Sequence, residues 1–171
     1  MYKIVRKKQL AENVNEYVVE APLAALKAQP GQFVILRVDS EGERVPFTIA
    51  DYDPDKGTVT ILVQTVGATT ELLSRLNEGD SVADFVGPLG NPTDLTKYDK
   101  VLLVGGGIGG AVIHPQAKLL KKIGKPADVV LGARTKSLLL YMDEMQAFAA
   151  ELYPMTDDGS YGEKGFVTDA V

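Results

Sequence analysis

The periodicity of apolar residues changes near residue 97, and this change constrains the fold more than any other feature of the sequence. Before it, short runs rich in Val, Ile, Tyr, Phe and Thr alternate with turn-forming Gly, Pro and Asp, a pattern typical of antiparallel strands. After Lys100, continuous apolar runs alternate with segments at helical spacing, which favours a parallel sheet. We therefore expect a sandwich or barrel over residues 1–97 and an α/β domain over residues 98–171, joined by the Pro- and Gly-containing segment 87–100.

The expected elements follow from this periodicity. In the first part the strands fall at residues 2–9, 15–22, 32–38, 46–52, 58–66 and 81–87. A short helix is expected at residues 68–77, because Leu72, Leu73 and Leu76 share one helical face. In the second part we expect strands at 100–106 and 127–134 and helices at 111–124 and 137–152.

The last residues, 165–171, read as the end of a strand followed by Thr168 and Asp169 as helix-cap residues. The α/β part then holds about three strands, against roughly five to six in an average sheet. We therefore expect the chain to stop inside this domain. The alternative is a small natural domain that a partner chain completes.

Composition narrows the function classes. The net charge is −5 without blocks of like charge, which argues against a nucleic-acid or anionic-membrane surface. There is no cysteine, so disulfides and thiolate chemistry are excluded within this chain. The one histidine, His114, cannot form a zinc site by itself, and we expect it to be a surface or packing residue. No segment resembles a signal peptide or a membrane span, so we expect a soluble, cytoplasmic protein.

A glycine cluster follows the first strand of the α/β part. Residues 101–110 read VLLVGGGIGG, in which Gly105, Gly107 and Gly110 fit G-x-G-x-x-G between a strand and a helix. In that context bare backbone and helix-end N–H groups bind a pyrophosphate. The acidic residue of an ordinary Rossmann site is absent, because the next strand ends Gly132-Ala133-Arg134-Thr135. The sequence predicts a phosphate-binding turn; a glycine turn that only packs helix on strand is the alternative.

The first part offers a second candidate for phosphate binding. Arg44 precedes the strand residues 45–50, and the segment 67–70, Gly-Ala-Thr-Thr, opens the short helix. An arginine side chain and a glycine-led helix start are independent ways to hold phosphate.

Several segments together resemble the ferredoxin–NADP reductase superfamily, and the resemblance covers essentially the whole chain. They are PGQFVIL (30–36), RVPFTIAD (44–51), VGATTELL (66–73), GPLGNP (87–92), VGGGIGG (104–110), GART (132–135) and TDDGSYGEKGFVTD (156–169). The nearest branch is that of electron-transfer flavoprotein subunits: the small subunit of NADH-dependent ferredoxin:NADP oxidoreductase, the sulfide dehydrogenase beta subunit and the dihydroorotate dehydrogenase electron-transfer subunit.

This resemblance implies a Greek-key β-barrel that binds FAD, followed by an incomplete domain that binds NAD or NADP. The implied reaction passes hydride from NAD(P)H to FAD and then single electrons to an iron–sulfur centre and a larger oxidoreductase subunit, in a heterodimer. A [2Fe–2S] cluster is implied only for the longer family chain. The alternatives are a dihydroorotate dehydrogenase electron-transfer subunit and a barrel module that has lost its flavin.

The resemblance also implies roles for individual residues. Thr48 is the candidate catalytic residue, near the reactive nitrogen of the flavin. The other implied cofactor contacts are Arg44, Pro46, Phe47, Ile49, Gly67, Thr69 and Thr70 for FAD, and Gly105, Gly106, Gly107, Gly109, Gly110, Gly132, Ala133 and Arg134 for the nicotinamide nucleotide. Asp157 and Asp158 are expected either to contact a ribose of that nucleotide or to have a structural role.

Four departures from the family pattern stand out, and one of them is that the family chains continue through further strands that complete the nicotinamide pocket. Arg44 lies four residues before Thr48, where the superfamily motif places it three before, and Gly110 is followed by Ala111-Val112 where an Ala-Pro step is usual. The chain also lacks the cluster cysteines of its relatives. Arg134, Lys136 and Ser137 are candidates for reading a 2′-phosphate, and the choice between NAD and NADP stays open.

Overall fold

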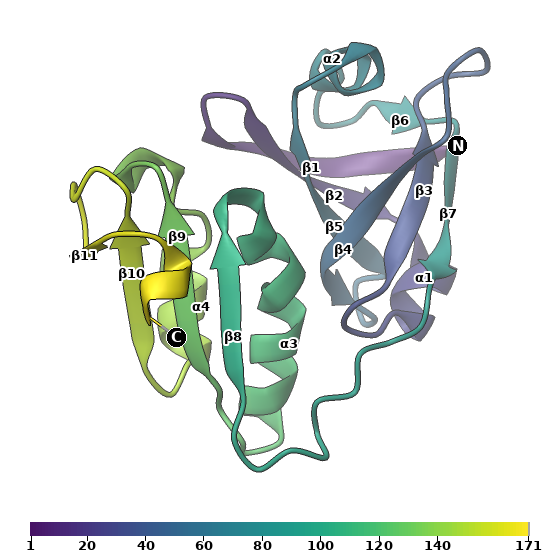
Figure 1. Ribbon diagram of the computed structural model, residues 1–171. Helices are drawn as coiled ribbons and strands as arrows, with labels where there is room; N and C mark the ends of the chain where they lie inside the picture. The colour runs from purple at the N-terminus through teal and green to yellow at the C-terminus, as the bar shows by residue number, and fades with distance from the viewer. Residues whose placement is uncertain (171) are drawn as a thin grey trace. The chain divides into compact units, whose positions relative to one another are not determined.

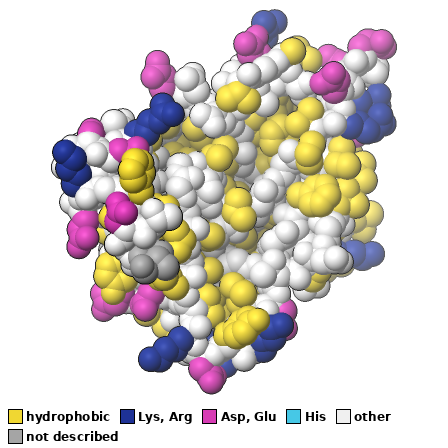
Figure 2. All heavy atoms as spheres, viewed as in Figure 1, with side chains coloured by type: hydrophobic (Ala, Val, Ile, Leu, Met, Phe, Trp, Pro, Cys, Tyr) yellow, Lys and Arg dark blue, Asp and Glu magenta, His cyan; other side chains and the backbone are white. Residues whose placement is uncertain are grey.

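The computed structural model describes residues 1–170, which form two compact units, Met1–Thr93 and a second that begins at Asp94 (Figure 1). The division lies within the Pro- and Gly-containing segment 87–100. On the face drawn in Figure 2, acidic and basic side chains are interspersed. Among the described residues, no helix is long and apolar enough to cross a membrane.

The first unit is one antiparallel sheet with the strand order β6-β1-β2-β5-β4-β3-β7. Its strands are β1 Tyr2–Ala11, β2 Val14–Glu20, β3 Phe33–Arg37, β4 Val45–Asp53, β5 Thr58–Gln64, β6 Ser81–Val82 and β7 Asp84–Leu89. Strands β3, β4 and β5 follow one another as hairpins, and β2 lies beside β5, which is the Greek-key arrangement.

The two edge strands, β6 and β7, are consecutive in the chain and are joined by Ala83. The Ala83 N–H lies 3.0 Å from the carbonyl oxygens of both Arg37 and Val38 at the end of β3. The sheet therefore curls into a nearly closed barrel. The expected single strand 81–87 is corrected to these two, because its two ends pair with opposite edges of the sheet.

Apolar side chains at alternating strand positions fill the interior of the barrel. Val59, Ile61 and Val63 of β5 point inward with Val34 and Leu36 of β3, and all five are buried. Helix α2, Ala68–Ser74, adds Leu73 to this core and is shorter than the expected 68–77. Helix α1, Pro22–Lys27, was not expected; it starts with proline in the first turn, where a missing N–H costs nothing.

The second unit is a parallel sheet with the order β11-β10-β9-β8. Its elements are β8 Leu102–Gly106, the 3-10 turn η1 Gly107–Gly109, α3 Gly110–Lys122, β9 Asp128–Ala133, η2 Lys136–Leu138, α4 Met142–Phe148, β10 Leu152–Thr156, β11 Glu163–Lys164 and η3 Val167–Ala170. The predicted fold class, an antiparallel barrel followed by a parallel α/β unit, is confirmed.

Two expectations in this unit are wrong. The helix expected at 137–152 is confined to Met142–Phe148, because Tyr141 adopts a left-handed backbone (φ 59°) before it and Leu152 already belongs to β10. The strand end expected in 165–171 is also not found among the described residues 165–170, since η3 covers Val167–Ala170 and strand β11 ends at Lys164; Val171 lies outside the described residues. His114 of α3 is a packing residue, buried with its ring centroid 4.6 Å from that of Tyr141 and 5.5 Å from that of Phe148.

Candidate nucleotide-binding sites

The glycine turn lies between β8 and α3, at the carboxyl edge of the parallel sheet. In open α/β sheets ligands bind at this edge. The packing around each glycine separates two reasons for its presence. A Cβ on Gly105 would lie 2.9 Å from the Ile113 Cδ1 and 3.1 Å from the Gly110 nitrogen, so glycine is needed there to pack strand against helix.

Gly106 and Gly109 are different. A Cβ on either would meet no atom within 4 Å, and both backbones are ordinary for any residue, with φ −109° at Gly106 and φ −61° at Gly109. Neither crowding within the protein nor a left-handed backbone explains these two glycines. Space left open beside bare backbone fits the close approach of a ligand, which is how the turn would hold a pyrophosphate. Gly107, with φ 54°, needs glycine for its conformation.

The loops after β9 and β10 meet at the same edge of this sheet. The N–H groups of Asp157 and Asp158 donate to the carbonyls of Ala133 (3.1 Å) and Arg134 (3.2 Å). The Lys136 N–H donates to the Ser160 Oγ at 2.8 Å. The structure thus brings Arg134 and the two aspartates together, as parallel strands require of residues that follow their carboxyl ends.

The two aspartates have different surroundings. Asp158 accepts a hydrogen bond from the Ser160 N–H at 2.9 Å, and hydrogen bonding by Ser160 holds the pKa of this carboxyl below its ordinary value. Asp157 is exposed. Sequence reasoning missed Thr156, a fully buried residue whose Oγ1 donates to the Tyr161 carbonyl (2.7 Å) and accepts from the Tyr161 N–H (3.0 Å), fixing the loop.

Gly132 has a packing role in this structure. A Cβ there would lie 2.2 Å from the Val167 Cγ1, so the glycine lets η3 lie against β9. Gly132 and Ala133 are buried, whereas Arg134 is exposed. Lys136 extends its ammonium 4.9 Å from the centre of the Tyr161 ring. Arg134 and Lys136 are therefore two of the cationic side chains at this edge.

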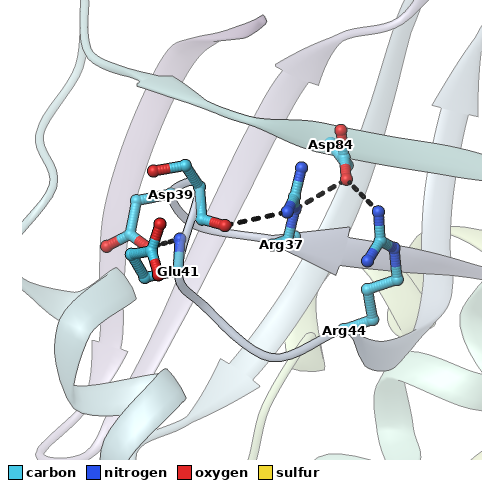
Figure 3. Close-up of polar contacts among 6 residues, drawn as sticks. Arg37, Asp39, Glu41, Arg44 and Asp84 are labelled. Atoms are coloured by element: carbon cyan, nitrogen blue, oxygen red, sulfur yellow. Dashed lines mark hydrogen bonds and ion pairs between the residues drawn. The ribbon is translucent and has the colours of Figure 1, made fainter.

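In the first unit, Arg44 belongs to a three-residue charge cluster drawn in Figure 3. Asp84 Oδ2 lies 2.9 Å from the Arg44 Nη2 and 2.7 Å from the Arg37 Nε. The Arg37 Nη1 also donates to the Ser40 carbonyl at 3.0 Å. Two guanidinium groups on one carboxylate leave a positive charge on the cluster, and Arg44 is its most exposed member. Arg37 and Asp84 were missed from the sequence, because only the β3–β7 register places them opposite each other.

The segment 46–49 splits between the two faces of β4. Ile49 is fully buried in the barrel core and Phe47 packs against that core. Pro46 and Thr48 face outward, opposite Ile35 and Phe33 of β3 in the register. Val86, half exposed on β7, lies on the other side of Ile35. The outer wall of the barrel therefore carries an apolar strip with the Thr48 hydroxyl on it, the kind of surface on which a flat aromatic ring can lie.

The turn before α2 is held by the hydroxyl of Thr70. Its Oγ1 accepts from the N–H groups of Val66 (2.9 Å) and Gly67 (3.0 Å) and donates to the Gly67 carbonyl (2.8 Å). The Thr70 side chain is thus committed to the turn itself, and Thr69 beside it is half-buried.

Neither backbone conformation nor packing within the protein requires a glycine at position 67. Its backbone is extended (φ −167°), and an added Cβ would meet no atom within 4 Å. Open space at Gly67 and the positive charge of the Arg44 cluster suit a pyrophosphate, and the apolar strip suits a flavin ring. The residues of the barrel therefore fit FAD.

Comparisons with known proteins agree with this geometry. Residues 1–93 match the family model described as the oxidoreductase FAD-binding domain. A dihydroorotate dehydrogenase B (NAD(+)) electron transfer subunit homolog from Thermotoga maritima is 47% identical over 169 residues, covering 99% of this chain and 60% of the relative. The corresponding subunit from a Geobacillus species is 38% identical over 174 residues, covering 98% of this chain and 67% of the relative.

Among solved structures, that of an NADH-dependent reduced ferredoxin-NADP oxidoreductase superposes with a TM-score of 0.92 and 46% identity, covering 99% of this chain and 61% of that one. The chain spans about 60% of the length of the Thermotoga relative. The resemblance to the ferredoxin–NADP reductase superfamily is confirmed. Because the family model covers more than half of the chain, the protein belongs to the family of oxidoreductase FAD-binding domains.

Proposed function

We propose that the chain is the FAD-binding part of an electron-transfer subunit that passes reducing equivalents between NAD(P)H and an iron–sulfur partner in a larger oxidoreductase subunit. The match of residues 1–93 to an FAD-binding domain carries the proposal. Flavin, when bound, supplies the chemistry of accepting a hydride and releasing its electrons. The protein supplies position and electrostatics.

Residues of the barrel take distinct parts in this proposal. Pro46 and the outward strip provide an apolar wall for the ring, and Thr48 offers its hydroxyl as a hydrogen-bond donor at the ring edge. Arg44, together with the turn at Gly67 and Thr69, faces the phosphates, with Thr70 holding that turn. Ile49 is left out of direct contact, because it has no exposed surface.

In the second unit, the open glycines Gly106 and Gly109 and the start of α3 are proposed to receive the pyrophosphate of the nicotinamide nucleotide. Arg134 is the proposed contact for its adenosine half, with Gly132 and Ala133 shaping the strand end beneath it. Asp157 offers an exposed carboxylate to ribose hydroxyls, while Asp158 keeps the loop folded. Arg134 and Lys136 would suit the 2′-phosphate of NADP, whereas Asp157 on the ribose would suit NAD, so the proposal includes both nucleotides.

The final acceptor depends on the partner subunit. Names of the relatives point to a dihydroorotate dehydrogenase and to a ferredoxin-NADP oxidoreductase, and both remain candidates. A module that has kept the barrel without flavin is the second candidate function, and the pairing of Arg44 with Asp84 is the observation that favours it.

Flavin content tests the proposal. The purified chain should be yellow and should release stoichiometric FAD on denaturation, and anaerobic NADH or NADPH titration of a chain extended to the length of its relatives should bleach the flavin. The variant Thr48→Val should retain flavin but slow its reduction, with Thr60→Val on the neighbouring strand as the control. A folded chain that takes up no added FAD would refute the proposal and favour the flavin-free module.

A further inference from the structure

Helix α2 receives hydrogen bonds at its carboxyl end from residues far away in the sequence. The Lys7 Nζ of β1 donates to the carbonyls of Ser74 (2.6 Å) and Leu76 (2.7 Å). The Tyr17 hydroxyl of β2 donates to the Leu73 carbonyl at 3.2 Å. Two side chains of the barrel wall thus bind three carbonyls, two in the last turn of α2 and one just after it.

These contacts answer a need of this helix. The last carbonyls of any helix have no partner within it, and seven residues are too few to form a stable helix alone. An ammonium group at the carboxyl end also opposes the negative end of the helix dipole. Lys7 supplies both a hydrogen-bond donor for the last carbonyls and a positive charge at this end of the helix. Its ammonium also lies 5.7 Å from the centre of the buried Tyr17 ring, so the helix end and this ring together fix its position.

The other end of α2 carries the turn at Gly67. Thr70 ties that turn to the first residues of the helix through three hydrogen bonds. A helix of this length spans about 10 Å and moves as a unit. Whatever fixes its carboxyl end therefore also fixes where the turn lies relative to the barrel wall.

We propose that Lys7 is a positioning residue for flavin binding: it anchors the carboxyl end of α2 to β1 and so holds the Gly67 turn where the pyrophosphate of FAD binds. This inference rests on the proposed function. In this proposal Lys7 contacts neither the flavin ring nor the phosphates, and its effect on binding passes through α2 alone. The proposal predicts that loss of the Lys7 side chain weakens binding of the FAD pyrophosphate and leaves binding of the flavin ring unchanged.

The test compares two flavins on the full chain. FAD carries the pyrophosphate, whereas riboflavin has the ring and ribityl chain without any phosphate. Apoprotein of the wild type, Lys7→Met, Lys7→Arg and Lys8→Met is titrated with each flavin by fluorescence quenching. Lys8 is the matched control, because it is the next residue of β1, carries the same charge and is exposed.

Lys7→Met should weaken FAD binding about tenfold, a change of about 1.4 kcal/mol, and change riboflavin binding less than about twofold relative to wild type. Lys7→Arg should recover most of the FAD affinity, and Lys8→Met should bind both flavins as the wild type does. Hydrogen exchange should show faster exchange in α2 of Lys7→Met and unchanged exchange in β2 and β5.

Tyr17→Phe gives a second probe, since it removes only the hydroxyl bonded to Leu73, and it should shift FAD affinity in the same direction by a smaller factor. Equal FAD affinity of Lys7→Met and wild type would overturn the inference and leave the proposed function standing. An equal loss for FAD and riboflavin would overturn it as well, because it would mark general destabilisation. A wild-type chain that binds no FAD would refute the proposed function, and this inference with it.

Discussion

Alanine substitutions in the glycine turn between β8 and α3 separate its packing role from its proposed ligand role. Gly105→Ala would place a Cβ 2.9 Å from the Ile113 Cδ1 and 3.1 Å from a backbone nitrogen. The flexible Ile113 end can shift but the backbone cannot, so we expect a loss of about 1–3 kcal/mol of unfolding free energy, as for overpacked cores. For a unit of the size of the one that begins at Asp94, each kcal/mol corresponds to a fall in Tm of about 4–8 °C.

Gly109→Ala should behave in the opposite way. Its backbone is already helical (φ −61°, ψ −20°) and the added Cβ meets no atom within 4 Å. Removing glycine from such a position restricts the unfolded chain and typically stabilises a protein by about 0.4–1 kcal/mol. The same methyl group would stand where bare backbone is proposed to meet a pyrophosphate, so affinity for a nicotinamide nucleotide should fall about tenfold or more, at about 1.4 kcal/mol per tenfold.

The assay pairs thermal unfolding of the apoprotein with calorimetric titration of NADH, NADPH and ADP. The two variants should be affected in opposite order: Gly105→Ala the less stable, Gly109→Ala the weaker binder at unchanged or higher Tm. Nucleotide binding by Gly109→Ala that equals the wild type would refute the reasoning that this glycine serves ligand approach. A Tm loss in Gly109→Ala as large as that in Gly105→Ala would refute the geometric argument itself.

Three further outcomes follow from single contacts. Thr70→Val leaves the N–H groups of Val66 and Gly67 without their acceptor and should lower the free energy of unfolding, measured by chemical denaturation, by about 1–2 kcal/mol. A denaturation midpoint Cm equal to that of the wild type would contradict the capping role. Gly132→Ala would drive a Cβ to 2.2 Å from the Val167 Cγ1 and should displace η3, which faster hydrogen exchange at 166–170 would report, whereas unchanged exchange would exclude the clash. Burial raises the pKa of Tyr17 from 10.0 to about 12, so its contribution to stability is complete below pH 10 and is lost as pH rises toward 12. Tyr17→Phe should remove that part of the alkaline fall in Tm, and an unaltered pH profile would argue against it.

Local patterns made most of the fold predictable. Alternation in the predicted strand 58–66 located β5, because Val59, Ile61 and Val63 on one face of that strand are buried in the barrel core. The leucines at 72, 73 and 76 predicted α2 for the corresponding reason, with Leu73 buried and the other two packed on the core. The sequence also predicted the glycine turn in its place between a strand and a helix.

Features that depend on distant contacts were missed. The run Leu138–Leu140 looked helical, but the left-handed Tyr141 follows it and no local residue type announces such a conformation. Strand β10 contains Pro154, and a proline argues against a strand when only the sequence is considered. The residues of β10 form a strand because they pair with β9. Lys7 and Tyr17 looked like ordinary strand residues, since their partner carbonyls are more than fifty residues away.

The segment 81–89 pairs with both ends of the strand order, through β6 on β1 and β7 on β3. Until that segment leaves the ribosome, β1 and β3 each present unsatisfied main-chain groups, and such edges are templates for association with another chain. The last strands of the barrel to be synthesised are therefore the ones that protect it from its neighbours, so slow translation just before residue 81 would prolong the period in which nascent chains can aggregate.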